Sequence, residues 1–153
     1  SYALAGRSGH VPGRGRSRRA RPQVIVVDAS AVLEVLLRTP VGSKVEERLF
    51  GKRQALHAPH LLDIEVAQVI RRFAASGTID GARGEAALQD LADLPVRRHS
   101  HGILLPRIWA LRRNYTAYDA SYVALAEALD APLVTRDRRL ANGAGHGARI
   151  EAM

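Results

Sequence analysis

The sequence of 153 residues contains no cysteine, which excludes disulfide bonds, thiolate metal sites and cysteine nucleophiles. It has no apolar run approaching the roughly 20 residues of a membrane-spanning helix, and its first residues lack the apolar core of a signal peptide. It also has no phosphate-binding loop ending in Gly-Lys-Ser or Gly-Lys-Thr. We therefore expect a cytoplasmic protein, with no membrane contact, whose chemistry relies on oxygen and nitrogen groups.

Acidic side chains are absent from the first 23 residues, which carry six of the 23 basic side chains. Because this segment is rich in Gly, Arg, Ser and Pro, we expect residues 1–23 to form a disordered basic arm and residues 24–153 to form one folded domain. The arm is interpreted as a tag, a start site assigned too far upstream, a presequence or a tail that contacts RNA phosphates. The folded part holds the other 17 basic and all 15 acidic side chains, so the net charge of +8 belongs mainly to the arm.

The rest of the sequence alternates short β-branched runs with amphipathic segments. Strands or extended pieces are expected at residues 24–27, 57–59, 95–99, 132–135 and 149–150. Helices are expected at residues 31–37, 42–50, 60–76, 84–92, 103–113, 116–129 and 136–140. Glu34 should lie on the outer side of the first helix and Trp109 on the apolar side of the fifth. The alternation predicts an α/β fold with a central, mostly parallel sheet and helices on both of its faces.

Four acidic residues do not follow the pattern of a solvated surface. Asp28 and Asp137 each come directly after a buried strand or within two residues of it, and parallel strands end at the same edge of a sheet. Glu65 shares the apolar face of its helix, and Asp119 lies on the inward stripe of the next long helix. Asp28 and Asp119 also stand where helix-capping residues are common, so capping remains an alternative interpretation for both.

Carboxylates that converge within a few ångströms cannot all stay ionised without a compensating charge, because like charges raise one another's pKa. A hard divalent cation provides that charge, and an all-oxygen donor set without His or Cys suits Mg²⁺ or Mn²⁺. The histidines at positions 57, 60, 99 and 101 lack metal-ligand spacing and are interpreted as surface or loop residues. The sequence therefore predicts an acidic Mg²⁺ or Mn²⁺ site at one edge of the sheet.

The motifs Asp28-x-Ser30, Pro59 to Val66, Thr116-Ala117-Tyr118-Asp119-Ala120 and Thr135-Arg136-Asp137 occur in an order that resembles a PIN-domain ribonuclease of the VapC toxin type. The resemblance implies a three-layer α/β/α sandwich. It also implies a metal-dependent endoribonuclease toxin of a type II toxin–antitoxin pair, which cleaves tRNA or rRNA in a bacterial or archaeal cytoplasm. A VapB-like antitoxin and a homodimer are the implied protein partners. The implied metal-binding and catalytic set is Asp28, Glu65, Asp119 and Asp137, with Ser30 and Thr135 as hydroxyls that line the site.

Basic residues near these motifs are candidates for contacts with substrate phosphates. The residues nominated are Arg112, Arg113, Arg136 and Arg138. Two other functions stay open at this point. The chain could be a catalytically silent PIN-like module that binds RNA or protein. It could also be a phosphohydrolase with an aspartyl nucleophile, although such enzymes usually need a second Asp two residues after the first, where this chain has Ser30.

Overall fold

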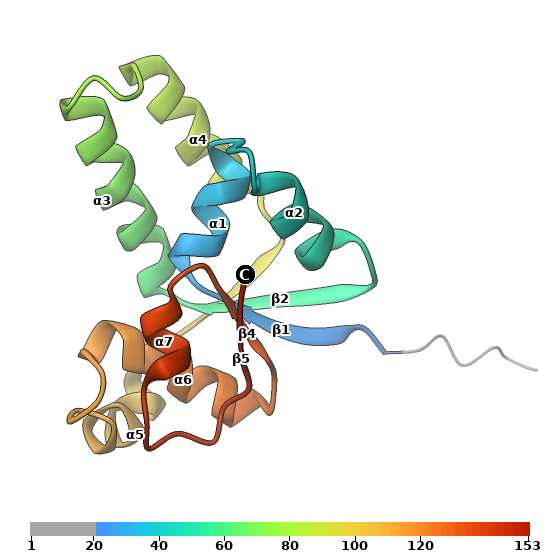
Figure 1. The fold of residues 1–153 in the computed structure, drawn as a ribbon, viewed down its shortest axis with the longest axis vertical. Coiled ribbons are helices and arrows are strands. Elements are labelled where there is room, and N and C mark those ends of the chain that lie inside the picture. Colours follow the sequence, from blue (N-terminus) through green and yellow to red (C-terminus); the bar gives the residue numbers. More distant parts are fainter. Residues whose placement is uncertain (1–20) are drawn as a thin grey trace, which may run out of the picture.

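The β-branched run after Pro22 forms the central strand of a five-stranded parallel sheet in the computed structural model, which describes residues 21–153 (Figure 1). The strands are β1 (Gln23–Val27), β2 (Gln54–Pro59), β3 (Val96–His99), β4 (Leu133–Thr135) and β5 (Ile150–Ala152). Ile25, Val26 and Val27 are fully buried, as expected for a strand that is covered on both faces. Every pairing in the sheet is parallel.

Helices cover both faces of this sheet. One layer contains α1 (Ala29–Leu36), α2 (Gly42–Phe50), α3 (Leu61–Ala75) and α4 (Gly81–Asp93). The other contains the short 3₁₀ helix η1 (Gly102–Leu104) and then α5 (Leu105–Ala110), α6 (Ala117–Leu129) and α7 (Arg138–Asn142). Ile25 and Val27 pack under the first layer, whereas Val26 packs under the second, because alternate side chains of a strand point to opposite faces. The predicted three-layer α/β/α sandwich is confirmed (Figure 1).

The strand order is β3-β2-β1-β4-β5, so the chain reverses its direction across the sheet between β1 and β4. From β1 it continues outward to β2 and β3, and it then returns to the opposite side of β1 to form β4 and β5. At such a reversal the connections leave the two central strands in opposite directions, which opens a crevice outside their carboxyl ends. The segments that follow Val27 and Thr135 therefore border one crevice.

Several element boundaries differ from the predicted ones. The extended piece expected at residues 57–59 is the second half of an interior strand, β2, which the weakly β-forming Gln54 and Ala55 begin. Helix α4 begins at Gly81, three residues earlier than predicted, because Asp80 caps it by accepting from the Arg83 N–H at 2.7 Å. The last helix, α7, spans Arg138–Asn142 and is shifted by two residues, since Asp137 is its N-cap.

The predicted helix at residues 103–113 is wrong in extent and in orientation. It is divided into η1 and α5, and its chain leaves helical geometry after Ala110. Leu104, Ile108 and Leu111, at spacings of four and three residues, form the buried stripe. Trp109 falls outside that stripe and is 68% exposed, with the Arg112 guanidinium over its ring at 4.6 Å.

One further expectation about a side chain is corrected, and one contact between side chains was not predicted. Glu34 is not on an outer surface, because its side chain is only 22% exposed and pairs with Arg136 of the segment after β4. His57 and His99 lie in strands β2 and β3, within the extended segments predicted at residues 57–59 and 95–99, and His57 Nδ1 lies 2.7 Å from His99 Nε2. Neighbouring parallel strands bring these two rings together across the sheet, which sequence spacing does not reveal.

The predicted disordered arm lies almost wholly outside the described residues, and only its end is seen. Gln23 is already part of β1, so the folded part includes at least this one residue more than predicted. In the described part of the chain, no helix combines the length and apolar character that crossing a membrane requires.

Candidate active site

An open cleft of about 630 Å³ lies at the carboxyl ends of β1 and β4, where the strand order reverses. All four predicted acids line it, together with the predicted hydroxyl of Ser30. They come from four different elements: the end of β1, helix α3, helix α6 and the start of α7. Sequence-distant acids are therefore brought to one cleft, as the sequence predicted from strand ends and helix faces. The acids of the cleft are Asp28, Glu65, Asp119 and Asp137.

Asp28 is the most enclosed of the four, with an exposed fraction of 5%. Its Oδ1 accepts the Ala31 N–H at 3.1 Å, so Asp28 does cap α1, and it also accepts the Ser30 hydroxyl at 2.7 Å. Its Oδ2 accepts the Thr135 hydroxyl at 2.6 Å. Burial raises the pKa of Asp28, and the two hydroxyl donors partly oppose this rise. Capping and placement in the cleft are thus compatible functions of one carboxylate.

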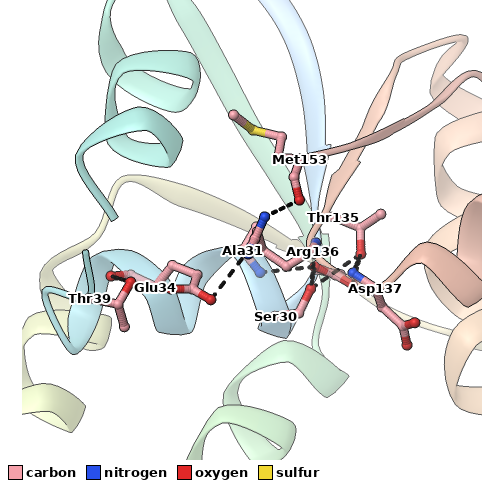
Figure 2. A network of polar contacts seen from close by, with 9 residues as sticks. Ser30, Ala31, Glu34, Thr39, Thr135, Arg136, Asp137 and Met153 are labelled. Carbon is pink, nitrogen blue, oxygen red and sulfur yellow. Dashed lines mark hydrogen bonds and ion pairs between the residues drawn. The ribbon is translucent and has the colours of Figure 1, made fainter. Parts of the chain in front are cut away.

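Ser30 and Thr135 connect the ends of β1 and β4 through a hydroxyl network. The two hydroxyl oxygens lie 3.2 Å apart, and each also accepts a backbone N–H from the segment after β4. Arg136 N–H donates to the Ser30 oxygen at 2.8 Å, and Asp137 N–H donates to the Thr135 oxygen at 2.9 Å (Figure 2). Because Thr135 is fully buried, this network fixes the position of the Asp28 carboxylate relative to the backbone of Asp137.

Glu65 lies in the second turn of α3, on the side that lines the cleft. Its Oε1 and the hydroxyl of Tyr122 are buried, and neither has a hydrogen-bond partner among residues 21–153. Burial raises the pKa of Glu65, the nearby Tyr122 hydroxyl opposes this rise, and the neighbouring carboxylates of Asp119 and Asp28 add to it. The Tyr122 hydroxyl lies near Glu65 without well-formed hydrogen-bond geometry, so Glu65 Oε1 keeps the capacity to accept a cation or a proton from the cleft.

Asp119 and Asp137 have opposite environments. Asp119 lies in the first turn of α6, where Thr116 rather than Asp119 caps the helix by accepting the Asp119 N–H at 3.1 Å. Burial raises the pKa of Asp119, and repulsion from Asp137 adds to the rise. The hydrogen bonds of Arg139 instead lower the pKa of Asp137. Both of its carboxylate oxygens accept from that guanidinium, at 3.1 and 2.9 Å.

The donor set of the cleft fits a hard divalent cation in kind. All four groups are carboxylates, three of them have raised pKa values, and Glu65 Oε1 is buried without a partner. Within residues 21–153, however, no three His, Asp or Glu side chains stand close enough together to chelate a metal ion as arranged. The side chains of Asp28 and Asp137 are turned toward hydroxyl and guanidinium donors instead.

The nominated arginines do not line the cleft. Arg112 lies over Trp109, and Arg136 pairs with Glu34 at 3.5 Å and donates to the Met153 carbonyl (Figure 2). The cleft is lined instead by two arginines that sequence reasoning did not select, Arg72 and Arg139. The sequence spacing of each arginine could have indicated its place near an acid of the cleft. Arg72 follows Glu65 by seven residues, which is two helical turns on the same face, and Arg139 follows the capping Asp137 by two.

The PIN domain family model matches residues 25–145 of this chain. The chain is 42% identical to ribonuclease VapC12 of Mycobacterium tuberculosis over 84% of this chain and 98% of that protein. It is 46% identical to ribonuclease VapC9 of the same species, over 78% of this chain and 90% of that protein. The chain therefore belongs to the PIN-domain family and, within it, to the VapC ribonucleases.

The fold agrees with this assignment. The structure of VapBC2 from Rickettsia felis, bound to a DNA fragment from their promoter, superposes with a TM-score of 0.63 over 85% of this chain and 98% of that chain. At 12% identity this likeness concerns the fold alone.

Proposed function

We propose that this chain is the metal-dependent endoribonuclease toxin of a type II toxin–antitoxin pair, and that it hydrolyses phosphodiester bonds of tRNA or rRNA in the cytoplasm. The observation that carries the proposal is the convergence of four carboxylates on one cleft at the reversal of strand order. The relationship to VapC ribonucleases, over most of the length of each protein, supports the choice of RNA as substrate.

Mg²⁺ or Mn²⁺ held by Asp28, Glu65, Asp119 and Asp137 would activate water and neutralise charge on the scissile phosphate. The side chains of the cleft orient the metal ligands and supply positive charge for the substrate. The Ser30 and Thr135 hydroxyls orient the Asp28 carboxylate, which leaves it little rotational freedom to lose when a ligand binds. Arg72 and Arg139 place positive charge in the lining of an otherwise acidic cleft, where RNA phosphates would enter.

The protein partners form the second part of the proposal. Membership of the VapC ribonucleases supports a VapB-like antitoxin that inhibits the enzyme. Solvent-exposed apolar side chains in and near α5 support a homodimer, because a second copy could cover them. These are Ile103, Leu105 and Trp109, which are 88%, 57% and 68% exposed. Sedimentation of the purified chain tests the dimer, since a monomer at micromolar concentration would contradict it.

The decisive test is cleavage of total RNA by the full chain with Mg²⁺, with Mn²⁺ and with EDTA, compared with Asp119→Asn. We expect discrete, metal-dependent products that the variant does not form. Asp130→Asn is the matched control: it makes the same chemical change at the other end of α6, at a residue in the left-handed conformation that Asn adopts readily. Thermal unfolding of both variants verifies that they fold.

Cleavage that persists in EDTA, or in Asp119→Asn at the level of the control, would contradict the proposal. If RNA is bound but never cleaved with any divalent metal, the catalytically silent binding module becomes the better account. The phosphohydrolase alternative predicts release of inorganic phosphate from small phosphoesters, which the same preparations can be assayed for.

A further inference from the structure

Arg139 forms three hydrogen bonds with one acid of the cleft, Asp137. Its Nη2 donates to Asp137 Oδ2 at 2.9 Å and its Nε donates to Oδ1 at 3.1 Å. Its backbone N–H also donates to Oδ1, at 2.9 Å. Both oxygens of one carboxylate are therefore engaged by a single residue. In the described part of the chain, the other arginine of the cleft, Arg72, forms no ion pair with these acids.

The two partners of this pair differ in their freedom to move. The side chain of Arg139 is 87% exposed, whereas that of Asp137 is 23% exposed. The guanidinium can swing into solvent while its backbone stays in α7, so the contact can open without any change in the fold. The cap of α7 survives such a movement, because it is made by the backbone N–H of Arg139.

A divalent cation in the cleft would interact with more carboxylates than the Arg139 guanidinium does. Arg139 engages Asp137 alone, whereas a cation at the centre of the cleft would be attracted by four carboxylates at once. Glu65 Oε1, which is buried and has no partner among residues 21–153, would gain one in that case. A doubly charged ion can therefore compete with the guanidinium for Asp137, although it must break the forked contact to do so.

We propose that Arg139 is an internal counterion of the metal-free cleft: its guanidinium occupies the Asp137 carboxylate, and a divalent cation must displace it before Asp137 can serve as a ligand. Arg139 thereby holds the affinity of the cleft for metal below the value that its four acids would give. This inference rests on the proposed function, since it takes Asp137 as a metal ligand. It makes Arg139 a positioning residue that acts through Asp137.

Binding of Mn²⁺ to the full chain, measured by calorimetry and by electron paramagnetic resonance of the free ion, tests the inference. Removing an exposed ion pair by Arg139→Gln should tighten Mn²⁺ binding by about fivefold. Arg138→Gln is the matched control, because it removes the same charge from the adjacent residue, whose side chain forms no ion pair within residues 21–153. Arg139→Lys should bind Mn²⁺ with intermediate affinity, since an ammonium group cannot form the fork.

The possible results separate the two proposals. If wild type binds Mn²⁺, Asp119→Asn does not, and Arg139→Gln binds no more tightly than Arg138→Gln, the counterion is refuted while the metal-dependent function stands. If wild type and Arg139→Gln both fail to bind Mn²⁺, or if Asp119→Asn binds it as wild type does, both proposals fall. Tighter binding in Arg139→Gln alone, with affinity partly restored to the wild-type value in Arg139→Lys, supports the counterion.

Discussion

Replacement of Thr135 by valine isolates the contribution of one hydroxyl to the cleft. The residue is fully buried, and its Oγ1 donates to Asp28 Oδ2 at 2.6 Å and accepts from the Asp137 N–H at 2.9 Å. Valine has nearly the same shape, so Thr135→Val removes both contacts without opening a large cavity. The substitution leaves a carboxylate oxygen and a backbone N–H without these partners.

The expected loss follows from these two contacts. A hydrogen bond to a charged group contributes about 1.5–3 kcal/mol, and an unpaired buried N–H costs about 1 kcal/mol or more. We therefore expect Thr135→Val to lower the free energy of unfolding by about 3 kcal/mol at pH 8. For a domain of this size, that corresponds to a fall in Tm of roughly 10 °C.

The same substitution predicts a dependence on pH. Burial raises the pKa of Asp28 above its ordinary value of 3.8, and the Thr135 hydroxyl, which stabilises the ionised form, partly opposes this rise. The hydroxyl therefore contributes most where Asp28 is ionised in the folded protein. As the pH falls through the raised pKa of Asp28, the folded protein loses the ionised form that the hydroxyl stabilises, so the loss caused by Thr135→Val should be smaller at pH 4 than at pH 8.

Urea denaturation of the metal-free protein at the two pH values measures this loss. Thr135→Ser is the control, because it keeps the hydroxyl and removes one methyl group, which should cost about 1 kcal/mol. The reasoning is refuted if Thr135→Val is within 0.5 kcal/mol of wild type, which is about the scatter of neutral substitutions, or if Thr135→Ser is the more damaging change.

Two further predictions concern Glu65 in the cleft and Arg98 between α3, α4 and β3. Because burial raises the pKa of Glu65 above its ordinary 4.5, the folded protein loses stability as the pH rises through that raised pKa. Glu65→Gln should thus stabilise the EDTA-treated protein in urea denaturation at pH 8 but not at pH 4. The gain should be at most about 1 kcal/mol, because solvent screens a half-buried group. Destabilisation by Glu65→Gln at pH 8 would contradict this prediction. Arg98 joins α3, α4 and β3 through Asp63 at 2.9 Å and the Leu91 and Val96 carbonyls at 3.0 and 2.9 Å. Arg98→Ala should lower the free energy of unfolding by about 2 kcal/mol in urea denaturation. The control Arg97→Ala, at an exposed position of the same strand, should lower it by under about 0.5 kcal/mol. Equal losses would show that Arg98 does not join these elements.

The sequence by itself determined the layers of the fold and the acids of the cleft. The four β-branched residues before Asp28 predicted a strand buried on both faces, as in the middle of a parallel sheet, and the apolar periodicity around Glu65 and Asp119 assigned their helix faces. These signals are local, because strand and helix periods depend on neighbouring residues alone. The sequence also predicted that Asp28 and Asp137 follow strands that end at the same edge of a parallel sheet, but not that these strands are neighbours.

Tertiary structure decided which contacts those residues make. The pairing of β1 with β4 brings Thr135 to Asp28 across 107 positions of sequence, and no local pattern specifies that distance. Side-chain direction was equally inaccessible. Trp109 faces solvent although it is the only tryptophan, because its neighbours Ile108 and Leu111 already fill the stripe that packs on α6.

The cations of the cleft show the same division. Arg136 and Arg138 flank Asp137 in sequence, yet Arg139 is the residue whose guanidinium reaches its carboxylate. The reason is geometric: Asp137 caps α7, and the first turn of a helix directs the chain so that the second residue after the cap returns toward the capping oxygens. Charge near an acid can be read from a sequence, but which charge pairs with it depends on the backbone path that the whole fold imposes.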